Sequence, residues 1–316
     1  MKKVTLFSWL SIVMLAVLVA GCQSADNNQV ETNDNNQPKT EETSSYTVKD
    51  DRGKEVKLEK IPETVISLQP SNTETLFALG VGDKVIAVNE FDNYPEETSK
   101  LERVADAVNI NAERILELNP DVVFAFSNGD ETAIKPIEDA GIPVFVIQSA
   151  LTFEDVYDDI KQISEVMGVK DKGEELAANI QTKVTEVENK LADIDKKQRV
   201  YFEISPSPDI YTTGKNTFQQ EILQKAGIEN IFGEQEGWIK VSEEEILKQN
   251  PDIIVTTVNY ADDPIAEIKS RQGWDSLDAV KNDKVFFLDP DIMSRPGPRI
   301  GEAVELAAKI AYPELF

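Results

Sequence analysis

The side chains that could do chemistry in this sequence are mainly carboxylates, lysines, arginines and hydroxyls. Its 316 residues include no histidine and one cysteine, with 58 acidic and 32 basic residues. Without imidazole there is no Ser-His-Asp triad, no histidine general base and no histidine-rich zinc site. A single thiol leaves no disulfide within the chain. The formal charge of −26 repels phosphate backbones, which argues against nucleic-acid binding.

The one cysteine, Cys22, follows a segment typical of exported proteins. Two lysines precede an apolar stretch over residues 4–20, and small residues stand directly before Cys22. This arrangement resembles a bacterial lipobox, in which the cysteine receives lipid and becomes the new N-terminus. The alternative is an uncleaved anchor, since the apolar stretch has about the shortest length that spans a bilayer. We predict a signal peptide over 1–21, lipidation of Cys22 and a disordered polar tether over 22–45.

Aromatic and arginine side chains stand in loops that could line a binding site. Phe91 and Tyr94 belong to one loop, and Trp238 lies in another that glycine bounds. Arg295 and Arg299 flank the prolines of a third loop. Rigid aromatic faces suit a flat, bulky ligand, and guanidinium groups can hold a phosphate or a carboxylate. Phe91 also fits a core position, and Arg299 also fits a structural ion pair at the start of a helix.

The elements that must position these side chains occur twice. Residues 113–124 and 244–255 are identical at six of twelve positions and apolar in both at three more. Each predicts a short helix that stops at Asn-Pro, followed by a strand buried on both faces. Ser242 and Glu245 predict a capping box at the start of the second copy.

A second, weaker repeat relates residues 74–81 to residues 221–228. Glutamate, leucine, glycine and a β-branched residue recur at the same spacing, and the glycines predict helix C-caps. Strands and helices alternate throughout the chain, which predicts two Rossmann-like α/β lobes with largely parallel sheets. The other expected strand cores are 64–68, 85–88, 144–147, 200–204 and 285–288.

The segment between the lobes contains no strand signal and no proline. One helix should end near Met167, and a second, over about 172–194, carries apolar residues at helical spacing. A helix of about twenty residues is about 30 Å long, enough to bridge two lobes and leave a ligand cleft between them. The predicted parts are an N-terminal lobe over 46–152, a bridging helical segment over 153–195 and a C-terminal lobe over 196–316.

This layout resembles the helical-backbone substrate-binding lipoproteins of ABC importers, which bring ferric siderophores, haem or cobalamin to a permease. Three motifs carry the resemblance across the mature chain: Ile66–Glu74, the two Asn-Pro-Asp units and Ser294–Arg299. The Arg-Pro-Gly-Pro-Arg stretch, with Gly237-Trp238, is most similar to the cobalamin-binding branch.

The resemblance implies roles for particular residues. Glu74 and Glu221, one in each lobe, would dock into arginine pockets on paired permease subunits that work with an ATPase. Their positions alone also suit the first turn of a helix. The protein would be a monomer, anchored by lipid at the outer face of the cell membrane, with no catalytic residue, metal site or cofactor. The residues expected to contact the ligand are Phe91, Tyr94, Trp238 and Arg295.

Charge favours cobalamin among the ligands of this family. Catecholate and citrate complexes of iron are strongly anionic, and the cleft loops offer few basic groups. Cobalamin has one phosphate and many amides, so one arginine, aromatic faces and weaker candidates such as Asn89 and Asn109 suffice. A ferric hydroxamate siderophore stays an alternative, and haem is disfavoured because only tyrosine could ligate its iron. The basic residues of these loops are Lys215, Lys240, Arg295 and Arg299.

Two other classes of protein fit the sequence less well. A glycosidase would need a carboxylate pair that stands out from the general acidity, and none does. A scaffold or adhesin would need an extended surface, whereas two lobes build a cleft. The sequence therefore predicts a binding protein and not an enzyme. Its lobes should close only slightly on the ligand, since a single helix bends less readily than flexible linkers.

Overall fold

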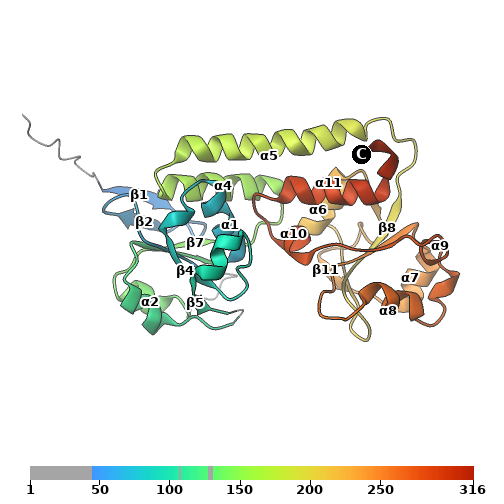
Figure 1. Cartoon of the computed structure of the whole chain (residues 1–316), viewed down its shortest axis with the longest axis horizontal. Coiled ribbons are helices and arrows are strands. Elements are labelled where there is room, and N and C mark those ends of the chain that lie inside the picture. The colour runs from blue at the N-terminus through green and yellow to red at the C-terminus, as the bar shows by residue number, and fades with distance from the viewer. Residues whose placement is uncertain (1–44, 107, 127–130) are drawn as a thin grey trace, which may run out of the picture. The chain divides into compact units, whose positions relative to one another are not determined.

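The computed structural model describes residues 45–106, 108–126 and 131–316, which belong to one compact unit, Thr43–Phe316. Two open sheets and a separate hairpin form its strands (Figure 1). The expected signal peptide, Cys22 and the tether up to residue 44 lie outside the described residues. Within the described ranges, no helix combines the length and apolar character needed to cross a membrane.

The sheet of the N-terminal lobe is parallel throughout, in the order β5-β4-β3-β6-β7. Its strands are β3 (Val65–Ser67), β4 (Val85–Asn89), β5 (Glu102–Ala105), β6 (Val122–Phe126) and β7 (Val144–Ile147). The helices between them are α1 (Pro70–Ala78), α2 (Ala112–Leu118) and α3 (Lys135–Asp139), with 3₁₀ turns η1 (Gly82–Lys84) and η2 (Glu96–Lys100). No signal in the sequence singled out the antiparallel hairpin of β1 (Tyr46–Lys49) and β2 (Glu55–Leu58) that precedes this sheet.

The sheet of the C-terminal lobe is mixed, in the order β11-β9-β8-β12-β13, with β10 beside β8. Strands β8, β10, β12 and β13 are parallel to one another. At one edge of the sheet, β9 pairs antiparallel with both β8 and β11. The strands are β8 (Arg199–Ser205), β9 (Tyr211–Thr213), β10 (Glu229–Asn230), β11 (Trp238–Lys240), β12 (Ile253–Thr256) and β13 (Val285–Phe287). The helices are α6 (Phe218–Lys225), α7 (Glu243–Gln249), α8 (Pro264–Ser270), α9 (Asp278–Lys281) and α10 (Pro290–Ser294), with 3₁₀ turns η3 (Trp274–Ser276) and η4 (Pro313–Leu315).

Helices α2 and α7, from the first repeat, begin and end in the same way. Asn111 caps α2 by accepting a backbone N–H, and Ser242 caps α7 in the predicted capping box with Glu245. Both helices end at an asparagine in the left-handed conformation, with φ of 46° at Asn119 and 44° at Asn250. Because proline follows each asparagine, neither helix can continue, and a buried strand begins directly afterwards.

Helices α1 and α6, from the second repeat, end at glycines, as the sequence predicts. Gly80 has a φ of 71° and Gly227 a φ of 68°. A residue with a Cβ is strained in this left-handed conformation, so glycine stops both helices at the same point of the repeat.

The three longer helices are α4 (Phe153–Val166), which packs on the N-terminal lobe, α11 (Ile300–Ala311), which packs on the C-terminal lobe, and α5 (Lys170–Lys190), which runs beside both. Helix α4 ends at Met167, as expected. Near the start of α5, the Lys172 ammonium donates to the carbonyl of Leu79 in the N-terminal lobe at 3.2 Å. Near its end, Glu188 pairs with Lys225 of α6 at 3.0 Å. Helix α5 therefore contacts both lobes, as Figure 1 shows.

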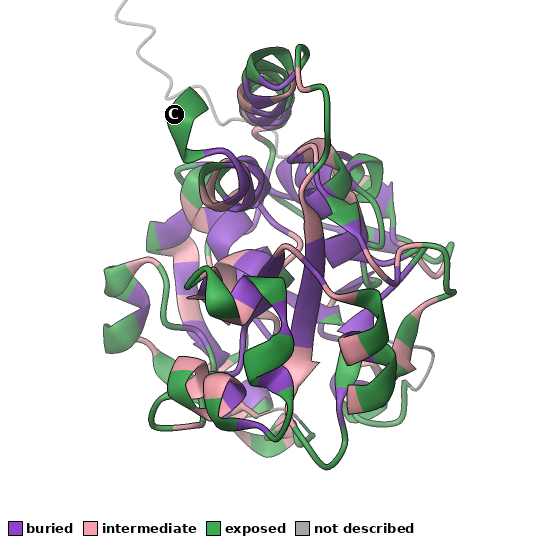
Figure 2. Cartoon of the chain, turned by 90° about the vertical axis from the view of Figure 1, so that its right-hand side faces the viewer, coloured by how far each residue is buried: buried purple, intermediate pink, exposed green. Residues whose placement is uncertain are grey.

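The apolar core is continuous between the lobes. One cluster of buried side chains includes Val65 and Phe124 of the N-terminal sheet, Val184 of α5, and Val200 and Val255 of the C-terminal sheet. Figure 2 shows the strands buried inside helices whose outer faces are exposed. Since a shared core must be disrupted before the lobes can separate, large hinge motions are disfavoured. The extent to which the lobes close on the ligand stays a prediction.

Candidate functional site

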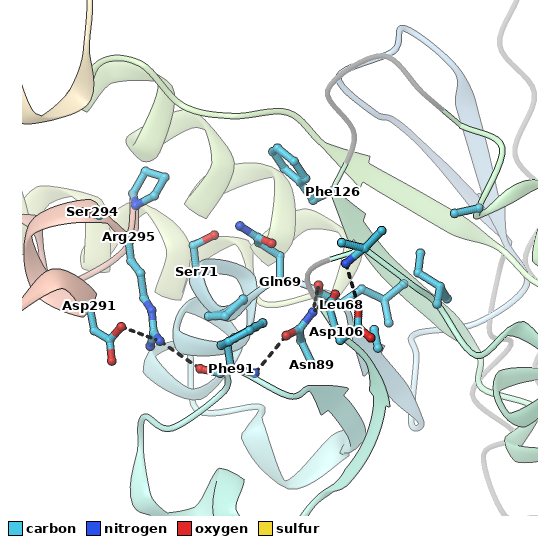
Figure 3. A pocket seen from close by; sticks show the side chains of 16 residues that line it. Leu68, Gln69, Ser71, Asn89, Phe91, Asp106, Phe126, Asp291, Ser294 and Arg295 are labelled. Atoms are coloured by element: carbon cyan, nitrogen blue, oxygen red, sulfur yellow. Dashed lines mark hydrogen bonds and ion pairs between the residues drawn. The ribbon is translucent and has the colours of Figure 1, made fainter. Parts of the chain in front are cut away.

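A cleft of about 660 Å³ opens at the carboxyl ends of the N-terminal strands (Figure 3). Ligands of open α/β sheets bind at this edge. Across from the sheet, the end of α10 and the residues that follow it supply Ser294, Arg295 and Pro296. The lining residues at or just after the ends of β3, β4, β5 and β6 are Leu68, Asn89, Ala105 and Phe126.

Phe91 gives the cleft an aromatic face, and Asn89 positions it. The Phe91 ring is 53% exposed and lines the cleft. The side-chain oxygen of Asn89, Oδ1, accepts the backbone N–H of Phe91 at 3.0 Å. The Asn89 amide donates to the carbonyls of Leu68 at 3.3 Å and Asp106 at 3.0 Å. Asn89 thus ties three strand ends together, and its amide is already occupied.

Phe126 is a second aromatic residue of the cleft, and the sequence did not single it out. It is the last residue of β6, its ring is partly exposed, and Figure 3 shows it on the side of the cleft away from Arg295. The sequence signal that could have identified it is its position at the end of the apolar run Asp-Val-Val-Phe-Ala-Phe. The final residue of a parallel strand lies at the ligand-binding edge, whereas the residues before it are core.

Glu74 is not exposed, so the expectation that it faces outward for docking is wrong. Its side chain is 1% exposed and meets two arginines of the C-terminal lobe. Arg299 donates from Nε to Oε2 at 2.7 Å and from Nη2 to Oε1 at 2.6 Å. Arg295 donates from Nη1 to Oε1 at 3.1 Å. We call Glu74, Arg295 and Arg299 the arginine junction, because they join α1 to the residues before α11.

Arg295 lines the cleft, but its hydrogen bonds are used within the protein. Besides Glu74, its Nη1 donates to Asn93 at 2.8 Å. Its Nη2 donates to the carbonyl of Phe91 at 2.9 Å and pairs with Asp291 at 2.9 Å (Figure 3). The Arg295 guanidinium could hold a phosphate or a carboxylate of a ligand through two hydrogen bonds, as expected, only if the ligand displaced one of these partners.

Arg299 forms the structural ion pair that its position before the last helix suggested. It is the N-cap residue of α11, and its guanidinium lies 4.2 Å from the centre of the Tyr94 ring. Burial acts to lower the pKa of Arg299, but the hydrogen bonds and charge of Glu74 outweigh it, so the pKa is raised. Tyr94 is half-exposed and packs on this arginine, outside the residues that line the cleft.

Glu221 occupies the second contact between the lobes. Its Oε2 accepts the backbone N–H of Phe153, the first residue of α4, at 2.8 Å. The Phe153 and Phe218 rings, both buried, lie beside it with centres 5.8 Å apart. Burial raises the pKa of Glu221, and nearby Lys225 partly offsets this. We call Phe153, Phe218 and Glu221 the phenylalanine junction.

Trp238 lies at the edge of the C-terminal sheet in β11. Its indole N–H donates to the Gln219 side chain at 3.1 Å, and about half of its surface is exposed. Trp238 is not among the residues that line the described cleft. Of the four basic residues of the cleft loops, Arg295 alone lines this cleft among the described residues.

The charges of the cleft are nearly balanced, with a small acidic excess. Its described lining residues carry one positive group, Arg295, and two negative groups, Asp106 and Asp291. In the described part of the chain, no three acidic or thiol side chains are grouped so as to hold a metal ion. The arrangement suits a bulky, nearly neutral ligand that is recognised by shape and hydrogen bonds.

The chain is similar in sequence to known binding proteins. The family model described as "Periplasmic binding protein" matches residues 65–292. The "uncharacterized ABC transporter substrate-binding lipoprotein YvrC" of Bacillus subtilis is 38% identical over 98% of this chain and 97% of its own length. A vitamin B12-binding protein of Vibrio parahaemolyticus is 32% identical over 77% of this chain and 86% of its own.

A solved structure shares the whole two-lobed fold. It is the crystal structure of a possible "iron-binding (periplasmic solute-binding) protein" from Staphylococcus epidermidis, with a TM-score of 0.73 and 36% identity. The match covers 80% of this chain and 100% of that chain. The relatives are thus binding proteins, and the ligands in their names differ.

Proposed function

The chain belongs to the periplasmic binding protein family, as a substrate-binding protein of an ABC importer, and from that premise we propose that its ligand is cobalamin. The charge of the cleft is the observation that carries this proposal. Its one guanidinium is neutralised by Glu74 and Asp291, so no free positive charge in the described lining awaits an anion. A strongly anionic ferric complex would be repelled there, whereas a ligand rich in neutral amides would not.

The apolar surface of the cleft supports the same ligand. Phe91 and Phe126 present partly exposed rings, and Leu68 and Ile110 add aliphatic surface between the strand ends. Apolar walls with a few fixed polar groups are typical of sites for large, flat cofactors. A ferric hydroxamate siderophore is the second candidate, because it too carries little charge and one relative is described as iron-binding.

Calorimetric titration tests the ligand directly. The purified protein should bind cyanocobalamin more tightly than about 1 μM and show no heat with a ferric hydroxamate or with haemin. Phe91→Ala should weaken cyanocobalamin binding about tenfold or more, because it removes the aromatic face from the centre of the site. Tight binding of the hydroxamate without heat from the corrinoid would replace cobalamin by the siderophore.

Trp238 and Tyr94 provide a test of how far the C-terminal lobe takes part. Trp238 is exposed at the edge of its sheet, so it can contact a ligand that extends beyond the described cleft. Trp238→Ala should then weaken binding, with Leu315→Ala as a control at an exposed apolar residue of the same lobe that lies in η4, away from the strand ends. Tyr94→Phe keeps the stacking on Arg299 and isolates the contribution of the hydroxyl.

Delivery to a permease requires an exposed surface on each lobe, and the first repeat offers one. Glu113 in α2 and Glu244 in α7 stand at the same position of the repeated segment, second in each helix, and both are exposed. Two glutamates at matched positions suit docking on paired permease subunits better than buried Glu74. We therefore place the docking contacts at Glu113 and Glu244. Their change to arginine should abolish cobalamin uptake by cells while leaving cyanocobalamin affinity intact.

The proposed location is the outer face of the cell membrane, with a lipid on Cys22. The support is the lipobox-like sequence and the lipoprotein name of the relative that matches nearly end to end. Labelled palmitate should enter the wild-type protein in cells and be absent from Cys22→Ala. Equal labelling of the two proteins would place the lipid elsewhere.

A further inference from the structure

A small hollow adjoins the cleft behind the start of α1. Its volume is about 110 Å³, enough for several water molecules. It has its own polar residues, among them Asn72, Gln148, Ser149 and Asp159. We call it the rear chamber. The residues that line both the rear chamber and the cleft are Gln69, Ser71, Phe126, Ser294 and Pro296.

Asp159 of α4 carries a partly buried carboxyl group that borders the rear chamber and also a neighbouring hollow beside Asp51. Among the described residues, none donates a hydrogen bond to it or forms an ion pair with it. The charges that act on it are those of Asp51, Asp155 and Asp158, all negative. First burial and then these charges raise the pKa of Asp159 to about 8. At neutral pH the group is therefore mostly a carboxylic acid, which can both donate and accept a hydrogen bond.

Asn72 of α1 is a second polar group without a partner in the rear chamber. The residue is 3% exposed, and no described group accepts from its Nδ2. Rotation about the terminal torsion exchanges the amide nitrogen and oxygen at nearly the same positions, so either can face the chamber. Buried polar groups are nearly always paired, so the unpaired amide of Asn72 and the Asp159 carboxyl, which has no described protein partner, leave hydrogen-bonding capacity at this hollow for water or a ligand group.

From this arrangement we propose that the rear chamber receives an uncharged carboxamide arm of the ligand, held by Asn72 and Asp159. The amide of Asn72 and the acid of Asp159 together offer the donors and acceptors that a primary carboxamide needs. The inference rests on the proposed function, since a corrinoid carries such arms around its ring. An ionised arm, such as a haem propionate, is excluded because no described residue of the chamber is cationic.

Variants of Asp159 test the chamber by calorimetry with cyanocobalamin. Asp159→Leu removes the hydrogen bonds and should weaken binding about tenfold, whereas Asp159→Asn keeps a donor and an acceptor and should bind like the wild type. Glu165→Leu is the control, because Glu165 lies in the same helix α4, is exposed, and neither lines the chamber nor acts on Asp159. Thermal unfolding of each variant confirms that it is folded.

The outcomes separate this inference from the choice of ligand. If the wild type binds cyanocobalamin and Asp159→Leu binds equally well, the rear chamber is not a subsite and cobalamin stays the ligand. If the wild type itself does not bind, both proposals fail. In a crystal structure of the complex, one carboxamide should lie within hydrogen-bond distance of the Asp159 carboxyl. A chamber that holds only water, with every amide elsewhere, would overturn the inference.

Discussion

The two junctions between the lobes are built around glutamates from the same repeat, yet they differ in chemistry. At the arginine junction, Glu74 is 1% exposed and meets two guanidinium groups. At the phenylalanine junction, Glu221 is only half-buried and accepts one backbone N–H beside two phenylalanine rings tilted by 43° to each other. In each case the glutamate lies in the repeated helix, α1 or α6, and contacts the start of another helix, α11 or α4.

The difference separates an ionic contact from a mainly apolar one. A buried cluster of charges is stable only while all its members are present, because a lone buried charge is costly. An apolar contact with one backbone hydrogen bond loses less when the acceptor changes. The arginine junction should therefore be the more sensitive of the two, and it borders the cleft.

Glu74→Gln should have the largest effect on stability. It leaves Arg299 without its counter-charge and Arg295 with Asp291 alone, and we expect a loss of about 3–5 kcal/mol in the free energy of unfolding. Urea denaturation measures the change, with the slope against urea as a check on the unfolded state. If this variant loses no more stability than Glu221→Gln, the arginine junction is not the more sensitive of the two.

Arg299→Lys should have an intermediate effect. Lysine keeps the positive charge but cannot reproduce the paired bonds from Nε and Nη2 to Glu74, nor the flat stacking on Tyr94. We expect a loss of about 2 kcal/mol by the same urea measurement. A variant as stable as the wild type would mean that charge alone, without fork geometry, holds this junction together.

Glu221→Gln should have a small effect of about 1 kcal/mol or less. The amide oxygen of glutamine can still accept the backbone N–H of Phe153, and the buried charge is removed. Phe218→Ala is the companion variant, because it attacks the ring contact of the same junction and should cost more. The reverse order would show that the hydrogen bond, and not the ring contact, stabilises the phenylalanine junction.

Asp92→Asn should change the pH dependence near the arginine junction. Burial raises the pKa of Asp92 to about 6, although hydrogen bonds from Thr73 and Asn89 and the charges of Arg103 and Arg295 lower it. The unfolded carboxyl titrates near pH 4. Between these values the folded protein holds the extra proton, so this group's contribution to stability is lost as pH rises from about 4 to 6.

The Asn variant should make the fall between pH 4 and 6 less steep, and it should keep the fall that Asp159 contributes from about pH 4 to 8. Midpoints of urea unfolding at several pH values give the measurement. An unchanged profile from pH 4 to 6 would show that Asp92 has an ordinary pKa in the folded protein.

Much of the fold could be predicted from local signals. The Asn-Pro stops after α2 and α7 and the glycine C-caps after α1 and α6 lie where the sequence places them, because proline and glycine restrict or free the backbone on their own. Strand β7 has the predicted bounds. The hairpin of β1 and β2 was missed, since short edge strands carry little periodic signal.

The candidate site was predicted less completely. Phe91 and Arg295 do line the cleft, but the sequence does not single out Phe126, and Tyr94 and Trp238 lie outside the described lining. Whether a side chain is exposed depends on whether its end of the strand borders the cleft, and the sequence pattern does not contain that information. The sequence does not show the partners of a charged side chain either, as Glu74 illustrates.

By itself, the sequence determined the repeated helix–strand units, the long connecting helix and the absence of histidine and disulfide chemistry. These follow from residue types and from spacing along one chain. Tertiary structure alone decided that Glu74 meets arginines more than two hundred residues away and that Asn72 and Asp159 border one chamber. Burial and pairing depend on contacts between distant segments, and the free energy of a charged group depends on those contacts more than on its neighbours in sequence.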